Sequence, residues 1–403
     1  MDLNTLCFFL FGVIFIGFLV LEGLDYGVGM LLPFVAKTDI ERQALVKAIA
    51  PVWESNQVWL IVAGGVLFAG FPEVYATLFS GLYIALFLIL TALLLRGMAI
   101  ELHNKDDNPT WRSFCYWSIF FGSLVPALLW GIAVAKLLQG LPIDGDKQYS
   151  GSFFDLLSLY SLVSGLAFVL LFLFHGAIYL SLRLEPSLAI GIKLVGLAAF
   201  KYTLLAALSL AVLTVTSTTA GNILLVFVLS FATLIALFIS SHYLSRKQFS
   251  RSLAGSSVAI ITLAATIFTG LYPRIIVSSL DPNWSLDIYN SSSNPLTLKI
   301  VTTAMLVILP VVIAFEMWKF HIFRHRITLQ KIELAPYMPG LRRMNKSLKQ
   351  CITYANCLAD AMDKIKKALQ SADGAIIKKL KPEHRTLLFG KRRLHWRQNR
   401  TRE

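Results

Sequence analysis

Long apolar stretches recur along this chain from Leu6 to Phe323, and they constrain its fold more than any other feature. A membrane-spanning helix needs about 20 predominantly apolar residues. Nine segments meet this requirement, at residues 6–35, 52–71, 75–101, 115–138, 156–182, 192–214, 222–243, 254–273 and 299–323. Only 15% of the 403 residues are charged, against about a quarter in an average protein. The sequence therefore predicts an all-α polytopic membrane protein and excludes a soluble enzyme.

The positive charge is concentrated after the last apolar segment. Residues 1–323 contain 17 basic and 17 acidic residues, whereas residues 324–403 contain 20 basic and 6 acidic ones. We therefore expect a membrane domain at 1–326 and a basic cytoplasmic tail at 327–403. Apolar residues at three- and four-residue steps predict an amphipathic helix near 341–371 in this tail. A basic segment after a span favours contact with the anionic inner leaflet over nucleic-acid binding.

The orientation of the membrane domain follows from the distribution of Lys and Arg between the connecting segments. The odd-numbered connections carry eleven basic residues and the even-numbered ones carry four. Because cytoplasmic connections are enriched in Lys and Arg, the N-terminus is predicted to lie outside and the tail inside. The first apolar segment lacks a basic leader and contains two acids, so we expect it to remain as a span rather than to be cleaved.

Several acids lie within the predicted spans, where ionisable groups are costly and are functional candidates. Glu22 and Asp25 are three residues apart and therefore share one helix face. Glu54 begins the second segment. In the predicted orientation all three lie in the inner half, where buried carboxyls suit proton uptake from the cytoplasm. We expect Asp25 and Glu54 to be buried functional groups, because short acids cannot reach far toward the interface.

Other polar residues in the spans have simpler interpretations. Arg96, Glu101 and Glu316 are expected to reach the interface or to pair with one another, as long side chains near helix ends do. His175 is the only histidine clearly inside a predicted span, and one such ligand cannot support a centre with several haems. A hydrogen-bonded structural role is therefore expected for it. The four cysteines form no CxxC pair, so no metal site is predicted. Close helix contacts are expected at Gly23, Gly27, Gly29, Gly64 and Gly65.

Six motifs occur in a recognisable order. They are residues 22–30 (EGLDYGVGM), 49–61 (IAPVWESNQVWLI), 96–101 (RGMAIE), 175–179 (HGAIY), 270–273 (GLYP) and 290–298 (NSSSNPLTL). As a set they resemble subunit II of the cytochrome bd family of quinol oxidases, over about residues 5–326.

The resemblance implies a fold and a function. The fold would be a nine-span subunit made of two four-helix bundles and one peripheral helix. The subunit would pair, in a bacterial inner membrane, with a similarly folded subunit I that carries the quinol site and haems b and d. Subunit II would stabilise this assembly, line a cytoplasmic proton-uptake route and bind no cofactor of its own. Other expected contacts are membrane lipid, quinone and a small single-span subunit, with no nucleic acid.

The resemblance also points to individual residues. Asp25 matches an acid of the family's proton route, which Glu22 adjoins. Glu54 stands where the family typically has Asp, so the carboxyl is kept one methylene further from the backbone. Trp53, Asn56 and Trp59 are candidates for either quinone or structural contacts. A proton-coupled secondary transporter and a purely structural membrane scaffold are the alternative functions.

Overall fold

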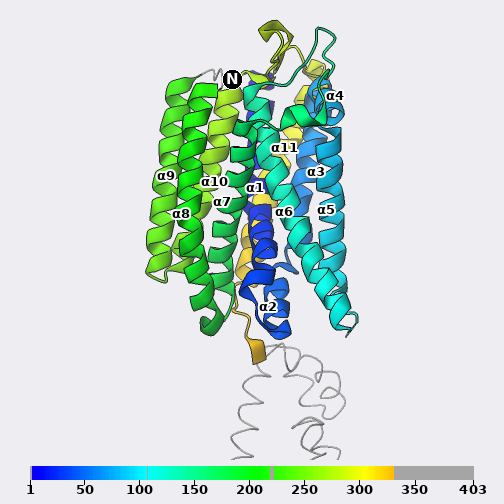
Figure 1. Ribbon diagram of the computed structural model, residues 1–403. Coiled ribbons are helices and arrows are strands. Elements are labelled where there is room, and N and C mark those ends of the chain that lie inside the picture. Colours follow the sequence, from blue (N-terminus) through cyan, green and yellow to red (C-terminus); the bar gives the residue numbers. More distant parts are fainter. Residues whose placement is uncertain (1, 107, 218–221, 331–403) are drawn as a thin grey trace, which may run out of the picture. The chain divides into compact units, whose positions relative to one another are not determined.

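The computed structural model describes residues 2–106, 108–217 and 222–330. Residues 1–327 form one compact unit. The predicted amphipathic helix near 341–371 lies outside the described residues. The architecture that follows is therefore that of the membrane domain (Figure 1).

The described part of the chain is almost entirely helical. Its α-helices are α1 (Leu3–Val35), α2 (Asp39–Ile49), α3 (Trp53–Gly70), α4 (Pro72–Gly81), α5 (Tyr83–Leu102), α6 (Pro109–Gln139), α7 (Leu159–Arg183), α8 (Pro186–Ser217), α9 (Ile223–Ser245), α10 (Phe249–Leu271) and α11 (Pro295–Ile322). Its short elements are the 3-10 turns η1 (Phe153–Leu156) and η2 (Pro282–Trp284) and the strands β1 (Arg274–Ile276) and β2 (Leu286–Asp287). Helices dominate because lipid offers no partners for backbone N–H and C=O groups, and a helix satisfies them internally.

Eight of the described helices, α1 and α5–α11, are long and apolar enough to cross a membrane. The second predicted span, 52–71, corresponds to α3, whose first turn is polar and lowers its mean hydropathy. The third predicted span begins as a separate short helix, α4, with Pro72 in its first turn. Proline suits this position, because an N–H there would have no partner within the helix. The nine predicted segments are thus all helical, with α4 and α5 replacing one continuous span.

The helices form two bundles and one peripheral helix, as the resemblance implied. Helices α1, α3, α5 and α6 pack into a first bundle, and α7–α10 into a second. The bundles meet where α1 and α6 pack against α7. Helix α11 contacts α1 and α3 (Figure 1), and only 17% of its apolar window is buried, against 72% for α7. It is therefore the peripheral helix.

Small residues allow α1 and α7 to pack at backbone distance. A Cβ added to Gly176 would lie 2.5 Å from the carbonyl carbon of Gly27, so neither position accommodates a side chain. Gly23 and Gly29 are also closely approached, as predicted. The prediction for Gly64 and Gly65 is wrong within this chain, because nothing lies within 4 Å of a Cβ added to either.

The connection between α10 and α11 contains a small antiparallel pair, β1 with β2. An amide side chain caps the helix that follows. Asn294 accepts a hydrogen bond from the backbone N–H of Thr297 at 2.9 Å and begins α11. This cap fixes the N-terminal end of the peripheral helix, whose C-terminal part contributes to the site described next.

Candidate functional site: a buried charge cluster

Three helices bring five ionisable side chains together inside the first bundle and its contact with α11. Glu22 and Asp25 come from α1, Arg96 from α5, and Glu316 and Lys319 from α11. The first three are fully buried, and Glu316 and Lys319 are 6% and 4% exposed. These five residues are called the charge cluster below. Burying so many charges is costly unless each is paired or hydrogen-bonded, so their partners decide what the cluster can do.

Arg96 and Glu22 form one pair. The Arg96 guanidinium donates to Oε1 of Glu22 and also lies over the ring of Tyr26, 4.9 Å from its centroid. The expectation that Arg96 reaches the interface or pairs with Glu101 is therefore wrong. Glu101 is exposed, because five residues further along α5 the helix presents a different face.

Asn56 of α3 connects Asp25 with Lys319. Its Nδ2 donates to Oδ2 of Asp25 at 2.8 Å and to the carbonyl oxygen of Leu21 at 3.3 Å. Its Oδ1 accepts from Nζ of Lys319 at 2.9 Å. Lys319 also donates to Oγ of Ser55 at 2.7 Å and pairs with Glu316, three residues earlier on α11. The amide thus links an acid on α1 to a cation on α11.

Three buried carboxylate oxygens of the cluster have no hydrogen-bond partner among the described residues, and one of them, Oε2 of Glu316, is compensated by its ion pair with Lys319. The other two are Oε2 of Glu22 and Oδ1 of Asp25. A buried acceptor without a donor costs about 1–3 kcal/mol, and more when it is charged. Two carboxylates on one helix face also repel each other. A proton bound at this position relieves both costs, so the arrangement can hold and release a proton.

The comparisons with known proteins identify the family. The family model described as cytochrome bd terminal oxidase subunit II matches residues 3–323. The chain belongs to this family.

Named relatives agree with this assignment. A cytochrome bd ubiquinol oxidase subunit 2 of Bacillus subtilis is 34% identical over 81% of this chain and 97% of its own length. A cytochrome bd-I ubiquinol oxidase subunit 2 of Escherichia coli is 32% identical over 82% of this chain and 97% of its own length. A chain of the bd oxidase from Geobacillus thermodenitrificans superposes with a TM-score of 0.62 at 17% identity, covering 80% of this chain and 99% of that chain. This last match supports the fold.

Family membership confirms the predicted fold class and the predicted role as a subunit of a quinol oxidase. The chain is a multi-pass inner-membrane subunit of a bacterial cytochrome bd-type quinol oxidase, an oxidoreductase complex in which a subunit II accompanies a subunit I. The transporter and scaffold alternatives are not favoured.

Within this subunit II, Glu54 does not join the charge cluster. Its side chain is exposed, whereas Asn56, two residues later, is buried. At about 100° per residue the two point to nearly opposite sides of α3. The expectation that Glu54 is buried is therefore wrong for the chain by itself, and the cluster has Asn56 at the point where α3 meets Asp25.

The two tryptophans of the same motif make contacts within the chain. Trp59 is buried, and its ring occupies the space beside Gly17 of α1. Trp53 is half-buried with its ring against Gly97 of α5. The buried indole Nε1 of Trp53 has no hydrogen-bond partner among the described residues. Trp59 and Asn56 thus make structural contacts, and Trp53 packs while keeping one donor free.

His175 of α7 is buried and hydrogen-bonded at both ring nitrogens. Nδ1 lies 2.7 Å from Oγ of Ser256, and Nε2 lies 3.2 Å from the carbonyl oxygen of Val20 on α1. A carbonyl only accepts, so Nε2 carries the proton and Nδ1 accepts from the serine hydroxyl. This arrangement leaves no lone pair for a metal and supports a structural role. In the described residues no three His, Cys, Asp or Glu side chains are grouped to hold a metal ion.

Sequence reasoning overlooked one member of the cluster. Lys319 was not singled out, although it lies three residues after Glu316 in an apolar segment and could have been recognised as its ion-pair partner. Glu316 was expected to reach the interface or to pair with Arg96 or Glu101, and it pairs with Lys319 instead. Lys201, which lies near the middle of α8, is exposed and stands apart from the cluster.

A second polar network lies outside the spans, where α2 meets α6. Asp39 accepts hydrogen bonds from Arg112 at 2.7 Å, Tyr116 at 2.8 Å and Gln43 at 2.9 Å. Partial burial tends to raise the pKa of Asp39, but the hydrogen bonds from Tyr116 and Gln43 and the charge of Arg112 outweigh it and hold the pKa below its usual value. The carboxylate therefore stays ionised at neutral pH and fastens α2 to the bundle.

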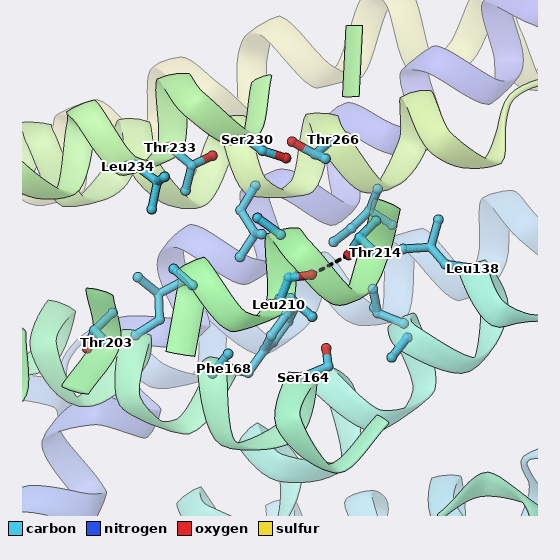
Figure 2. Close-up of a pocket in the computed structure, with 18 of the residues that line it drawn as sticks. Leu138, Ser164, Phe168, Thr203, Leu210, Thr214, Ser230, Thr233, Leu234 and Thr266 are labelled. Atoms are coloured by element: carbon cyan, nitrogen blue, oxygen red, sulfur yellow. Dashed lines mark hydrogen bonds between the residues drawn. The ribbon is translucent and has the colours of Figure 1, made fainter. Parts of the chain in front are cut away.

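The second bundle contains a cavity of about 50 Å³ between α6 and α7–α10 (Figure 2). Its polar lining consists of neutral hydroxyl side chains, which are Tyr160, Ser164, Thr203, Thr214, Ser230, Thr233 and Thr266. The Tyr160 hydroxyl lies 3.0 Å from Oγ1 of Thr214. Thr203 donates to the carbonyl oxygens of Leu170 and Ala199.

Proposed function

We propose that this subunit supports the reduction of oxygen to water by a haem-bearing subunit I, and that its charge cluster belongs to a proton-uptake route from the cytoplasm. Subunit I would carry haems b and d and the quinol site. The relatives named as ubiquinol oxidase subunits support a quinol as the electron donor. Reduction of oxygen to water consumes protons, so the complex needs groups that conduct them through the membrane domain.

The observation that carries this proposal is the environment of Asp25. The side chain is fully buried, one oxygen accepts from the amide of Asn56, and the other has no partner among the described residues. Such a carboxyl can accept a proton without breaking an existing hydrogen bond. Glu22, one turn earlier, offers a second unpartnered oxygen on the same face of α1. The two acids suit stepwise transfer of a proton along this helix.

The proposed direction of transfer follows from orientation. We infer an outside N-terminus and a cytoplasmic tail, because the basic connections, including the one that contains α2, alternate with poorly charged ones. The charge cluster would then lie in the inner half of the membrane. Glu54, exposed at the first turn of α3, would be a surface group at the entrance of the route. The predicted tail at 327–403 would rest on the inner leaflet, although it lies outside the described residues.

Further expected contacts belong to this proposal. The ring of Trp53 is half-buried, and its exposed part suits a packing contact with quinone or with a neighbouring subunit. A small single-span subunit and bound lipid would complete the assembly. No cofactor is assigned to the residues of this chain.

The proposal is tested by Asp25→Asn in the complete complex. Asparagine keeps the volume and can still accept from Asn56, but it cannot carry a proton. If this route is the main one, quinol oxidation should fall by about 10²–10⁴-fold, while the haem spectrum stays unchanged. Glu54→Gln should slow turnover less, because a solvent-exposed carboxyl can be bypassed by water. The matched control is Glu101→Gln, at the exposed end of α5. Full turnover of assembled Asp25→Asn complex would refute the proposal.

A further inference from the structure

The peripheral helix α11 carries two buried charged residues. Most of its surface is exposed, yet Glu316 and Lys319 point into the contact with α1 and α3 and are almost completely buried. A helix that served only to pack would not need an ion pair at this contact. Burying these charges is unfavourable in free energy, which indicates a role beyond packing.

The charge cluster contains one more acid than base. Its carboxyls are Glu22, Asp25 and Glu316, and its cations are Arg96 and Lys319. Arg96 pairs with Glu22, and Lys319 pairs with Glu316. Asp25 is therefore left without a cation of its own, and among the described residues its one side-chain donor is the neutral amide of Asn56. A single proton makes the buried cluster neutral, and Asp25 is the acid that lacks a charged partner.

Lys319 orients the amide of Asn56 together with the carbonyl oxygen of Leu21, which can only accept and lies 3.3 Å from Nδ2. An ammonium group can only donate hydrogen bonds, so the group 2.9 Å from Nζ of Lys319 must be the amide oxygen Oδ1. The Nδ2 group then necessarily faces Asp25. Without Lys319, rotation of the amide by half a turn would present an oxygen to the Asp25 carboxylate.

We propose that Lys319 is a positioning residue for proton transfer, which orients Asn56 toward Asp25 and supplies the cation that lets Asp25 release its proton. This inference rests on the proposed function of Asp25. Through Lys319, α11 sets the net charge of the cluster so that one proton binds and leaves during transfer. Lys319 itself does not carry the proton, because it acts through Asn56.

Other titratable and polar groups around Asp25 also influence how tightly it binds its proton. They are Glu22 and Tyr26 on α1, Ser55 and Asn56 on α3, Arg96 on α5, Tyr179 on α7, and Glu316 with Lys319 on α11. The Tyr179 hydroxyl donates to the carbonyl oxygen of Ala48 at 2.9 Å and is thereby kept neutral and fixed. Among these groups, Lys319 is the cation that reaches Asp25 through one intervening side chain.

The experiment compares pH profiles of quinol oxidation for complexes that carry Lys319→Met or Lys319→Arg. In Lys319→Met the cluster loses a cation and holds its proton more tightly. The alkaline limb of the profile should therefore move upward by roughly one to two pH units, the size expected for a charge several ångströms away. Lys319→Arg keeps the charge and the donor and should restore the wild-type limb. Lys299→Met, an exposed lysine on the same helix, is the control and should match the wild type.

Assembly is followed by the haem absorbance of purified complex. If Lys319→Met fails to assemble, the double variant Glu316→Gln with Lys319→Met removes the whole ion pair and leaves no unpaired partner on α11. Its alkaline limb should move in the same direction by a smaller amount, because an acid leaves together with the cation and the remaining effect is the loss of the ammonium that orients Asn56. A profile that overlays the wild type, in whichever of the two variants assembles, would overturn the role of Lys319.

A second comparison separates this inference from the proposed function. In the Asp25→Asn background, Lys319→Met should cause no further displacement of the limb, since the group that it acts on is gone. A displacement that persists without Asp25 would show that Lys319 acts elsewhere and would overturn the inference alone. Full turnover of Asp25→Asn would instead contradict the proposed function, and the inference with it.

Discussion

The two bundles of this subunit handle polar side chains in different ways. The second bundle, α7–α10, lines its cavity with neutral hydroxyls (Figure 2). One of them, Thr203, donates to carbonyl oxygens of α7 and α8. The first bundle buries Glu22, Asp25 and Arg96, whose side-chain partners all come from other helices. Hydroxyls are easily satisfied in a membrane, because a carbonyl one turn earlier is always within reach. Charges need partners on other helices.

The difference between the bundles indicates which buried polar residues are functional candidates. A threonine in a span can be replaced with little consequence, and its presence indicates nothing about chemistry. A buried carboxyl that depends on α3, α5 and α11 at once constrains three helices and costs stability. Its retention in an apolar bundle is explained by proton transfer, and packing alone would not require it.

The largest effect is expected from breaking the first bundle's central pair. Arg96→Met leaves Glu22 buried without its cation, which should destabilise the subunit by about 3–5 kcal/mol. The measurement is the yield of haem-containing complex in mild detergent and its thermal unfolding midpoint. Adding Glu22→Gln should recover most of the loss, because the double variant has no unpaired charge. If Arg96→Met alone were as stable as the wild type, the contrast between the bundles would be wrong.

A smaller effect is expected in the second bundle. Thr203→Val preserves the shape of a buried side chain and removes one hydroxyl, so it should cost about 0.5–1.5 kcal/mol. The acceptor Ala199 keeps its helical backbone hydrogen bond, which places the expected cost at the lower end. Ser209→Ala, whose hydroxyl bonds only to Leu205 of its own helix, is the control and should cost less still. A loss as large as that of Arg96→Met would contradict the distinction between hydroxyls and charges.

Much of this arrangement could be predicted from the sequence, and the reasons for the failures are physical. Apolar length predicts the spans, and the spacing of Glu22 and Asp25 correctly places both acids on one face of α1. Spacing within a helix does not reveal which residue of another helix lies opposite. The pairing of Arg96 with Glu22 and the selection of Asn56 over Glu54 therefore required the three-dimensional structure.

The helix boundaries and the contacts of the peripheral helix α11 were also only partly predictable from the sequence. Hydropathy merges α4 with α5, because apolar residues continue across the break at Leu82 and a single glycine, Gly81, is also tolerated inside a helix. Lys319 was predictable as a partner of Glu316, since both lie on α11. Its contact with Asn56 was not, because that depends on how α11 packs against α3.

The smallest expected effect is spectroscopic and concerns His175, which lies where the second bundle meets the first. Its hydrogen bonds to Ser256 and to the backbone of Val20 occupy both ring nitrogens, so it resembles the neutral hydroxyls of its own bundle more than the charge cluster. His175→Gln keeps a polar group at this contact, and the haem absorbance per assembled complex should equal that of the wild type. His175→Ala should give the same spectrum with a lower yield, because it also leaves a cavity. Loss of one haem band in either assembled variant would make His175 a ligand, and the neutral second bundle would then take part in the redox chemistry.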